Sequence, residues 1–362
     1  MMSIQGNFPR SVAPGRLAVS ASCVRFSGQG KPIASYFDVD GTLVQAIKRL
    51  KLSDKEHVKG NARVLNAFSE DVDTTLITGR SLQGFRETAK LLPPFPVGKV
   101  GINNGQELYV NHQRLPFHNW LSTLTREDED PQWRQMLAEK HGWNVDTVLQ
   151  GIQDVLKSEG FVRAPKKFQK FKHYKTSELF YRKAVPQGAT KPLEAPVFAE
   201  FYPDQPVFLL SSPEEKLPEA HSRFARAMAE NVAGFLRDKT VQFKQFIVDL
   251  GPYFDLVFTP DGINKGSLVK HTVAQSLPEA LVIAGDHKND LPMLSLKAVT
   301  NQAGKTVPVH PLLSGNHLNF ADLQALNANA VHAPEQCQLE GPLGELFSKL
   351  LRQIQTEQRS SS

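Results

Sequence analysis

Two pairs of acidic residues, each directly after a short apolar stretch, are the side chains of this sequence best suited to chemistry. They are Asp38 and Asp40 after residues 33–37, and Asp286 and Asp290 after residues 280–284. Carboxylates held close together repel one another unless a cation lies beside them, and carboxylate and carbonyl oxygens suit magnesium. A magnesium ion there would pair with a substrate phosphate, so that one carboxylate could attack phosphorus while its neighbour protonates the departing oxygen.

A hydroxyl and an ammonium group stand between the two acidic pairs in the sequence. Thr78 follows the β-rich stretch 74–77 in the segment Thr78-Gly79-Arg80, and Lys265 precedes a helical pattern. A phosphoryl group that spreads its charge over equatorial oxygens needs donors of these kinds. The four segments together therefore indicate phosphoryl-transfer chemistry.

The elements that must position these residues alternate between strand and helix. Apolar runs typical of buried strands occur at 33–37, 74–77, 99–102 and 280–284, and helical spacing occurs at 61–68, 81–92 and 266–275. This alternation predicts an α/β fold with a doubly wound, mostly parallel sheet. Ligands bind at the carboxyl ends of the strands of such sheets, which is where all four segments would meet.

The pattern changes between residues 118 and 255. Helices around Trp133 and at 145–156 and 223–236 mix with strand candidates at 168–181, 197–202, 207–210 and 243–248. We interpret this stretch as an α+β module inserted into the sheet domain. The expected division is a disordered or targeting segment at 1–30, a core in two parts at 31–117 and 256–352, an inserted cap at 118–255 and a frayed tail at 353–362.

The four segments, in this order, resemble the four motifs of phosphatases of the haloacid dehalogenase superfamily. That resemblance implies a Rossmann-like core with an inserted cap domain. It implies that Asp38 is the nucleophile that forms an aspartyl-phosphate, and that Asp40 is the general acid and then the general base. An acid at the second position favours phosphoryl transfer over dehalogenation within that superfamily.

The same resemblance assigns ligands to the remaining residues. Thr78, Gly79 and Lys265 would bind phosphate. The implied ligands of the cofactor, Mg²⁺, are Asp38, the Asp40 backbone carbonyl, Asp286 and Asp290.

The size and position of the insert match the larger α/β cap class of the superfamily, which includes Cof-type sugar-phosphate phosphatases, sucrose-phosphate phosphatases, trehalose-phosphate phosphatases and phosphomannomutases. Residues 103–109 resemble the strand and turn before the cap in the first two groups, and residues 174–177 faintly resemble a cap strand of the sucrose-phosphate group. The implied partner is a small phosphorylated metabolite, expected to be a sugar phosphate. Asn104, Lys175 and Asn289 are the candidate substrate contacts.

Plainer interpretations compete with several of these assignments. Asn104 and Asn289 are equally well explained as turn residues. The basic run 166–175 is better explained as a strand with its cations facing water than as an anion-binding surface. A phosphosugar mutase or phosphotransferase, and a non-catalytic binding or effector protein on the same fold, are the alternative functions.

Composition restricts partners and location. Four basic residues precede the first acidic residue, Asp38, so most of the formal charge of +5 belongs to the leading segment and a nucleic-acid partner is not indicated. Apolar runs are too short to span a membrane, which predicts a soluble protein. Cys23 and Cys337 lack metal-ligand spacing and favour a reducing, cytoplasmic location. The acid-free residues 1–30 leave an organellar or exported address open, and the oligomeric state is not predicted.

Overall fold

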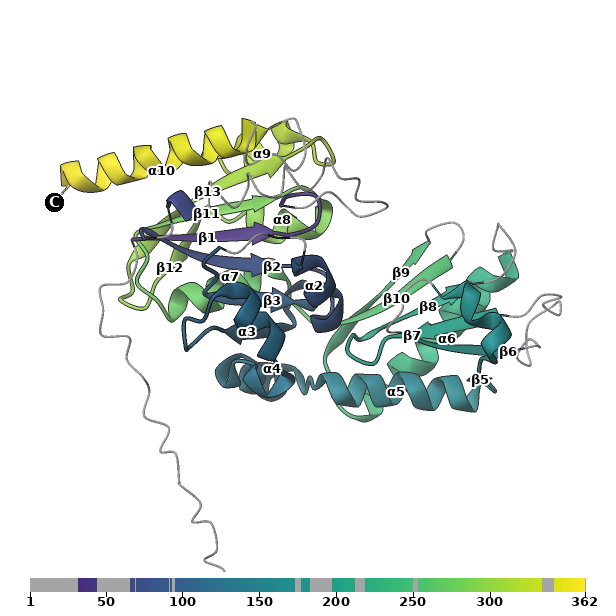
Figure 1. Cartoon of the computed structure of the whole chain (residues 1–362). Helices are drawn as coiled ribbons and strands as arrows, with labels where there is room; N and C mark the ends of the chain where they lie inside the picture. The colour runs from purple at the N-terminus through teal and green to yellow at the C-terminus, as the bar shows by residue number, and fades with distance from the viewer. Residues whose placement is uncertain are drawn as a thin grey trace, which may run out of the picture. The chain divides into compact units, whose positions relative to one another are not determined.

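The chain folds around two β-sheets (Figure 1). The computed structural model describes residues 32–43, 66–68, 70–90, 92, 95–172, 177–182, 197–211, 219–249, 253–333 and 342–361. Three predicted features lie outside these ranges: the leading segment 1–30, most of the helix at 61–68 and the candidate substrate residue Lys175. None of the described helices combines the length and the apolar character that crossing a membrane requires.

The larger sheet has the strand order β12-β13-β11-β1-β2-β3-β4, with β14 paired to β13. Its strands are β1 (Ile33–Asp38), β2 (Val72–Ile77), β3 (Lys99–Ile102), β4 (Glu107–Val110), β11 (Ala280–Gly285), β12 (Ala298–Thr300), β13 (Thr306–Ser314) and β14 (Val331–Ala333). All pairs are parallel except β3 with β4 and β12 with β13. The predicted α/β fold with a mostly parallel sheet is therefore confirmed.

The central strand β1 is buried on both faces, as is usual for a strand inside a parallel sheet. Alternate side chains reach opposite layers: the Tyr36 hydroxyl lies 2.8 Å from the Thr272 hydroxyl, and the Phe37 ring packs 5.3 Å from the Phe347 ring. Phe37 pairs in register with Leu76 on one side and with Ala284 on the other. The residues that follow these positions therefore emerge together at one edge of the sheet.

Helices cover both faces of this sheet. They are α2 (Leu82–Ala89), α3 (Phe117–Thr123), α4 (Pro131–His141), α7 (Lys265–Ala274), α8 (Leu291–Leu294), α9 (Phe320–Leu326) and α10 (Pro342–Ser361), with 3₁₀ turns η1 (Asn103–Gly105), η2 (Arg126–Asp128) and η4 (Lys288–Asp290). Side-chain caps precede several of these helices. The Ser81 hydroxyl accepts a hydrogen bond from the Gly84 amide at the start of α2, and Asn264 forms a capping box with Ser267 at the start of α7.

The predicted frayed tail at 353–362 is wrong, because α10 continues to Ser361. Phe347, Leu351 and Ile354 recur at helical spacing and are buried against the sheet, so the last helix has an apolar face that holds it down. Gln355 also donates a hydrogen bond of 2.9 Å to the Asp71 carboxylate. The exposed polar residues Gln353, Thr356 and Glu357 lie on the outer face of this docked helix.

The smaller sheet is antiparallel and carries the inserted module. Its order is β5-β6-β7-β8-β10-β9, with β5 (Val162–Arg163), β6 (Glu178–Arg182), β7 (Val197–Phe201), β8 (Val207–Ser211), β9 (Phe243–Asp249) and β10 (Tyr253–Pro260). Helix α6 (Glu219–Asp238) contacts β9 and β10, and α5 (Val145–Ser158) packs on α6. Gly151 permits this helix pair, since any side chain there would collide with the ring of Phe235.

The predicted strand at 168–181 is wrong over its first part. Residues Lys166–Phe171 form the 3₁₀ turn η3, and within the described part of the predicted range the segment from Glu178 onward pairs in the sheet as β6. Phe168 and Phe171 are three residues apart and both pack on Phe198, with ring centroids 5.3 and 5.0 Å away. A 3₁₀ turn puts residues of that spacing on one side, whereas a strand would put them on opposite sides.

The predicted cap boundaries at 118 and 255 also need correction. Phe117, Trp120 and Leu121 of α3 belong to the apolar cluster around β1, and the Trp133 indole of α4 donates a hydrogen bond of 3.1 Å to the Gly105 carbonyl. Strand β10 stays in the smaller sheet until Pro260. The inserted module thus begins near α5 and ends with β10, because amphipathic helices pack on whichever sheet is nearest and the sequence pattern does not identify which.

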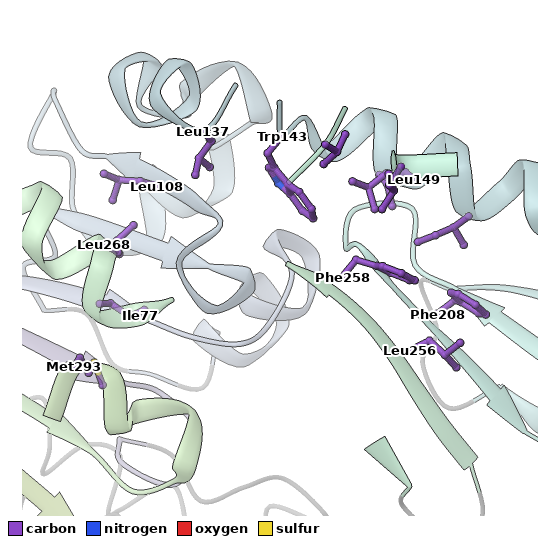
Figure 2. Close-up of a cluster of buried hydrophobic side chains, with 14 of the residues drawn as sticks. Ile77, Leu108, Leu137, Trp143, Leu149, Phe208, Leu256, Phe258, Leu268 and Met293 are labelled. Atoms are coloured by element: carbon purple, nitrogen blue, oxygen red, sulfur yellow. The ribbon is translucent and has the colours of Figure 1, made fainter. Parts of the chain in front are cut away.

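One apolar cluster continues from the larger sheet into the module. Leu268 of α7 and Leu108 of β4 belong to it, as do Leu137 of α4, Trp143 and, inside the module, Phe258 (Figure 2). Trp143 is 2% exposed at the connection between α4 and α5. The connection is therefore packed by apolar side chains on both sides.

We expect the stability of the fold to depend on pH through Glu129. Its backbone forms an isolated antiparallel β-bridge with Tyr109 of β4. Burial raises the pKa of its carboxyl from 4.5 to about 8, the Glu107 carboxylate adds to this rise, and Arg134 opposes it. Between these two pKa values the folded state binds more protons than the unfolded state. The contribution of Glu129 to the free energy of unfolding is therefore fully present below pH 4.5 and is lost as the pH rises through about 8. Glu129→Gln cannot ionise. Its melting temperature should therefore exceed that of the wild type by a margin that grows from about pH 5 to about pH 8.5.

The matched control for that measurement is Glu127→Gln, which changes an exposed glutamate two residues away. Thermal unfolding of the three proteins across the pH range is the measurement. A melting-temperature difference for Glu129→Gln that is the same at both ends of the range contradicts the assignment.

Candidate active site

A buried lysine joins the two acidic pairs at the carboxyl edge of the larger sheet. Lys265 is the first residue of α7 and is fully buried, and its Nζ donates hydrogen bonds to Oδ1 of Asp38 and, at 2.5 Å, to Oδ1 of Asp290. Asp38 ends β1 with 4% of its surface exposed. Burial alone would lower the pKa of Lys265, but the carboxylates of Asp38 and Asp290 outweigh burial and raise it.

Asp290 organises the loop that follows β11. Its Oδ2 accepts hydrogen bonds of 3.0 Å from the backbone amides of Asp286 and His287, while its Oδ1 accepts from Lys265. Gly285 lies against it so closely that a β-carbon would collide with the Asp290 side chain. Asp290 thereby fixes the position of Asp286 relative to Asp38.

Three carboxylates converge at this point. One oxygen from each of Asp38, Asp286 and Asp290 lies within 4.8 Å of the other two, and all three residues are buried. Oδ1 of Asp286 is buried and accepts no hydrogen bond. Burial raises the pKa of Asp38 well above its usual range, with Lys265 opposing this, and burial together with Asp290 raises the pKa of Asp286 to about 6.

These observations fit a hard divalent cation. Carboxylate oxygens are the ligands that Mg²⁺ prefers, and a bound cation would satisfy the unpaired oxygen of Asp286 and favour the ionised carboxylates. Three ionised carboxylates and one ammonium group carry a net charge of two negative units, which one divalent cation would neutralise. The side chain of Asp40 is not among the three carboxylates that converge here.

The Asp40 carboxylate is held by an arginine to which the sequence analysis gave no role. Arg80 binds it with both ends of its guanidinium, Nε to Oδ2 and Nη2 to Oδ1, each at 2.7 Å. The Thr78 hydroxyl lies 3.5 Å from Oδ2 of Asp40 and accepts a hydrogen bond of 3.1 Å from the Arg80 amide. The signal was present in the sequence, because Arg80 follows Thr78 at the same sheet edge as Asp40 and a bidentate pair is the preferred geometry for arginine with a carboxylate.

The asparagines after β3 stand beside this site. Asn103 and Asn104 both have left-handed backbone conformations, with φ of 51° and 58°, which asparagine tolerates better than most residues. Oδ1 of Asn104 accepts a hydrogen bond of 3.3 Å from Asn289, and a β-carbon on Gly79 would lie 3.1 Å from that same oxygen. Two of the predicted substrate contacts, Asn104 and Asn289, are thus together at the rim, next to the loop of Thr78.

A turn of the inserted module also reaches these loops, and sequence reasoning missed it. The turn joins β7 to β8 at residues 202–206. Gln205 donates to the Gly79 carbonyl at 3.2 Å, and the Asp204 carboxylate accepts from the Gln83 amide at 3.0 Å. Spacing along the chain carries no signal for such a contact, since it depends on how the module is placed over the sheet.

Gly41, directly after Asp40, has no room for a side chain. Its φ is +87°, and a β-carbon there would collide with the Asp286 carboxylate. We expect Gly41→Ala to lower the free energy of unfolding by more than the ~1–3 kcal/mol that left-handed strain alone costs, because Asp286 must also move. Gly262→Ala is the control: Gly262 has φ +72°, but a β-carbon added there would have no atom within 4 Å. Urea unfolding compares the two, and equal losses would contradict the collision.

The sequence and the fold both have recognisable relatives among known proteins. The sequence matches the model of the haloacid dehalogenase-like hydrolases over residues 35–300, and no curated protein matches it. Similar solved structures include the haloacid dehalogenase-like hydrolase protein yhjK from Bacillus subtilis, with 14% identity, a TM-score of 0.45 and coverage of 89% of this chain and 93% of that one. The sucrose-phosphatase from Synechocystis sp. PCC6803, solved with sucrose and phosphate, has 14% identity, a TM-score of 0.43 and coverage of 85% and 93%.

A haloacid dehalogenase-like hydrolase from Bacteroides thetaiotaomicron has 12% identity, a TM-score of 0.45 and coverage of 88% of this chain and 100% of that one. The region matched by the family model contains all four of the segments that meet at the sheet edge. The expected superfamily is confirmed, and the chain belongs to the haloacid dehalogenase-like hydrolase family.

Proposed function

We propose that this hydrolase is a Mg²⁺-dependent phosphatase that releases phosphate from a small phosphorylated metabolite, a sugar phosphate, through an aspartyl-phosphate on Asp38. The observation that carries the proposal is the junction of Asp38, Lys265, Asp286 and Asp290 at one sheet edge. The proposal that the substrate contains a sugar is based on the resemblance of residues 103–109 to the corresponding segment of sugar-phosphate phosphatases. The polar rim of Asn104 and Asn289 suits hydroxyl groups.

Asp38 is suited to be the nucleophile because its carboxylate is fixed and desolvated. Lys265 holds Oδ1, which leaves Oδ2 to attack phosphorus. In the proposed first step Oδ2 bonds to phosphorus as the bond from phosphorus to the leaving oxygen breaks. Water then attacks the aspartyl-phosphate, releases phosphate and restores Asp38.

Mg²⁺ would be held by the side chains of Asp38, Asp286 and Asp290 together with the backbone carbonyl of Asp40. When bound, it neutralises charge on the phosphoryl group and orients it for in-line attack. Thr78 and Gly79 would donate to the phosphoryl oxygens from the loop after β2, with Lys265 supplying a fixed positive charge. All of these donors sit on strand ends or on the first turn of a helix, so little reorganisation is required on binding.

Asp40 would move the protons. It gives a proton to the leaving oxygen in the first step and takes one from water in the second. Arg80 fixes the orientation of its carboxyl through two hydrogen bonds of 2.7 Å. Asp40 belongs to the same short loop as Asp38, so that the proton donor and the nucleophile are positioned by one backbone segment.

The primary test measures phosphate release from a panel of sugar phosphates with Mg²⁺ and with a chelator. We expect turnover in wild type with metal only, and Asp38→Asn to lose it by at least about 10³-fold, because the amide cannot form the intermediate. Asp73→Asn is the matched control: Asp73 lies on β2 opposite Ala34, at the far end of the strands. Phosphate found on a second sugar hydroxyl instead of in solution would identify a mutase. If folded wild type released no phosphate from any substrate, that result would argue against the proposal.

The role of Asp40 can be separated from that of Asp38 by the leaving group. With p-nitrophenyl phosphate the departing anion needs no proton, so Asp40→Asn should still phosphorylate Asp38 but stall before hydrolysis. We expect a burst of about one equivalent of p-nitrophenolate followed by slow turnover, and no burst with a sugar phosphate. Rapid-quench or stopped-flow measurements of both substrates decide this. Equal loss of the first turnover with both leaving groups would show that Asp40 is not the proton donor.

A further inference from the structure

The turn between β7 and β8 is the part of the inserted module that reaches the proposed phosphate-binding loop. Three hydrogen bonds join it to three core segments: Asp204 Oδ2 accepts from the Gln83 amide at 3.0 Å, the Asp204 carbonyl accepts from Asn103 Nδ2 at 3.4 Å, and Gln205 Nε2 donates to the Gly79 carbonyl at 3.2 Å. The three segments are the start of α2, the turn η1 and the loop after β2. All of them follow strands whose ends form the candidate active site.

The turn is pre-organised to make these contacts. Pro203 and Pro206 flank the two contacting residues and restrict the backbone, which reduces the freedom that docking would remove. The Gln205 amide donates to the Tyr202 carbonyl, and the Pro206 carbonyl accepts from the Phe258 amide at 3.0 Å, which ties the turn to β10. The polar tip is therefore presented by a rigid hairpin of the smaller sheet.

The core side of the contact is also fixed. Asn103 donates to Oε1 of Glu107 at 2.6 Å, and the Tyr109 hydroxyl donates to Oε2 of the same carboxylate at 2.7 Å, with Glu107 only 2% exposed. The Gln83 amide lies in the first turn of α2, where a backbone N–H has no partner within the helix. A carboxylate at that position also meets the positive end of the helix dipole, so Asp204 satisfies a donor that α2 cannot satisfy itself.

We propose that residues 202–206 form a latch that docks the inserted module on the loops of the active site, with Asp204 and Gln205 as positioning residues that determine which leaving groups are bound. The effect on substrates rests on the proposed phosphatase function, whereas the docking itself does not. A leaving group that reaches the module gains binding only while the latch is closed. A leaving group too small to reach it binds equally well in both states.

Docking is tested first by amide exchange, independently of activity. Gln205→Ala leaves Asp204 and its hydrogen bond to the Gln83 amide chemically intact. If the contacts open together, the Gln83 amide should exchange about three- to tenfold faster in this variant, as expected for loss of one hydrogen bond. An unchanged exchange rate at Gln83 would show that the contacts are independent of one another and that there is no latch.

The effect on substrates is tested with Asp204→Ala/Gln205→Ala and two phosphates of different size. We expect KM for a hexose phosphate to rise about tenfold or more, while KM for acetyl phosphate changes less than about twofold, because only the larger leaving group depends on the closed state. Asp204→Asn with Gln205 intact keeps an acceptor oxygen and should recover most of the affinity. An equal change for both substrates, or no recovery, overturns the positioning role.

A matched control is available on the module's own surface. Gln150 donates to Asp154 at 2.8 Å on the exposed side of α5, and the double alanine variant of that pair should change neither exchange at Gln83 nor either KM. If wild type releases no phosphate from any substrate, the proposed function fails and the exchange experiment still decides whether the latch exists.

Discussion

The buried ammonium of Lys265 is the interaction on which the rest of the site depends. It lies fully buried between the carboxylates of Asp38 and Asp290. Removing one partner from such an arrangement leaves an uncompensated buried charge and typically costs about 3–5 kcal/mol. Asp286 is a third carboxylate within reach of the same point, so the site keeps an excess of negative charge that Lys265 alone does not neutralise. The proposed cation would therefore answer to the burial and the charge of these side chains.

The scaffold fixes this cluster through strand register. Phe37 pairs with Ala284 in a parallel ladder, so Asp38 and the loop of Asp286 leave the sheet at the same level. Lys265 enters from the first turn of α7, where Asn264 and Ser267 form a capping box that sets the start of the helix. Because the backbone of regular elements determines these positions, the spacing of the charged groups is a property of the folded sheet, while the rim of Asn104 and Asn289 is left to loops.

Much of the larger sheet, and the acidic residues at its carboxyl edge, could be predicted because the sequence patterns that indicate them are local. Apolar runs predicted β1 and β11, and the acids that follow them meet because parallel strands end together. The strand predicted at 168–181 was wrong over its first part because the alternating pattern concealed the three-residue spacing of Phe168 and Phe171. The domain boundaries were misplaced because an apolar helix face such as that of α3, which packs in the cluster around β1, does not identify its sheet from sequence alone. Arg80 was overlooked although it follows Thr78 at the sheet edge where Asp40 also lies, because the sequence analysis gave roles only to the residues of the four recognised motifs.

The inserted module contributes through contacts that no local pattern encodes. Its apolar connection to the core surrounds Trp143, whereas its polar connection is the pair Asp204 and Gln205 at a hairpin tip. The hydrophobic stabilisation from burying Trp143 depends little on direction. The hydrogen bonds to Gln83 and Gly79, in contrast, require a narrow range of distances and angles. The apolar packing around Trp143 therefore leaves the orientation of the docked module to the polar contacts of Asp204 and Gln205, the second of which reaches Gly79, next to Thr78.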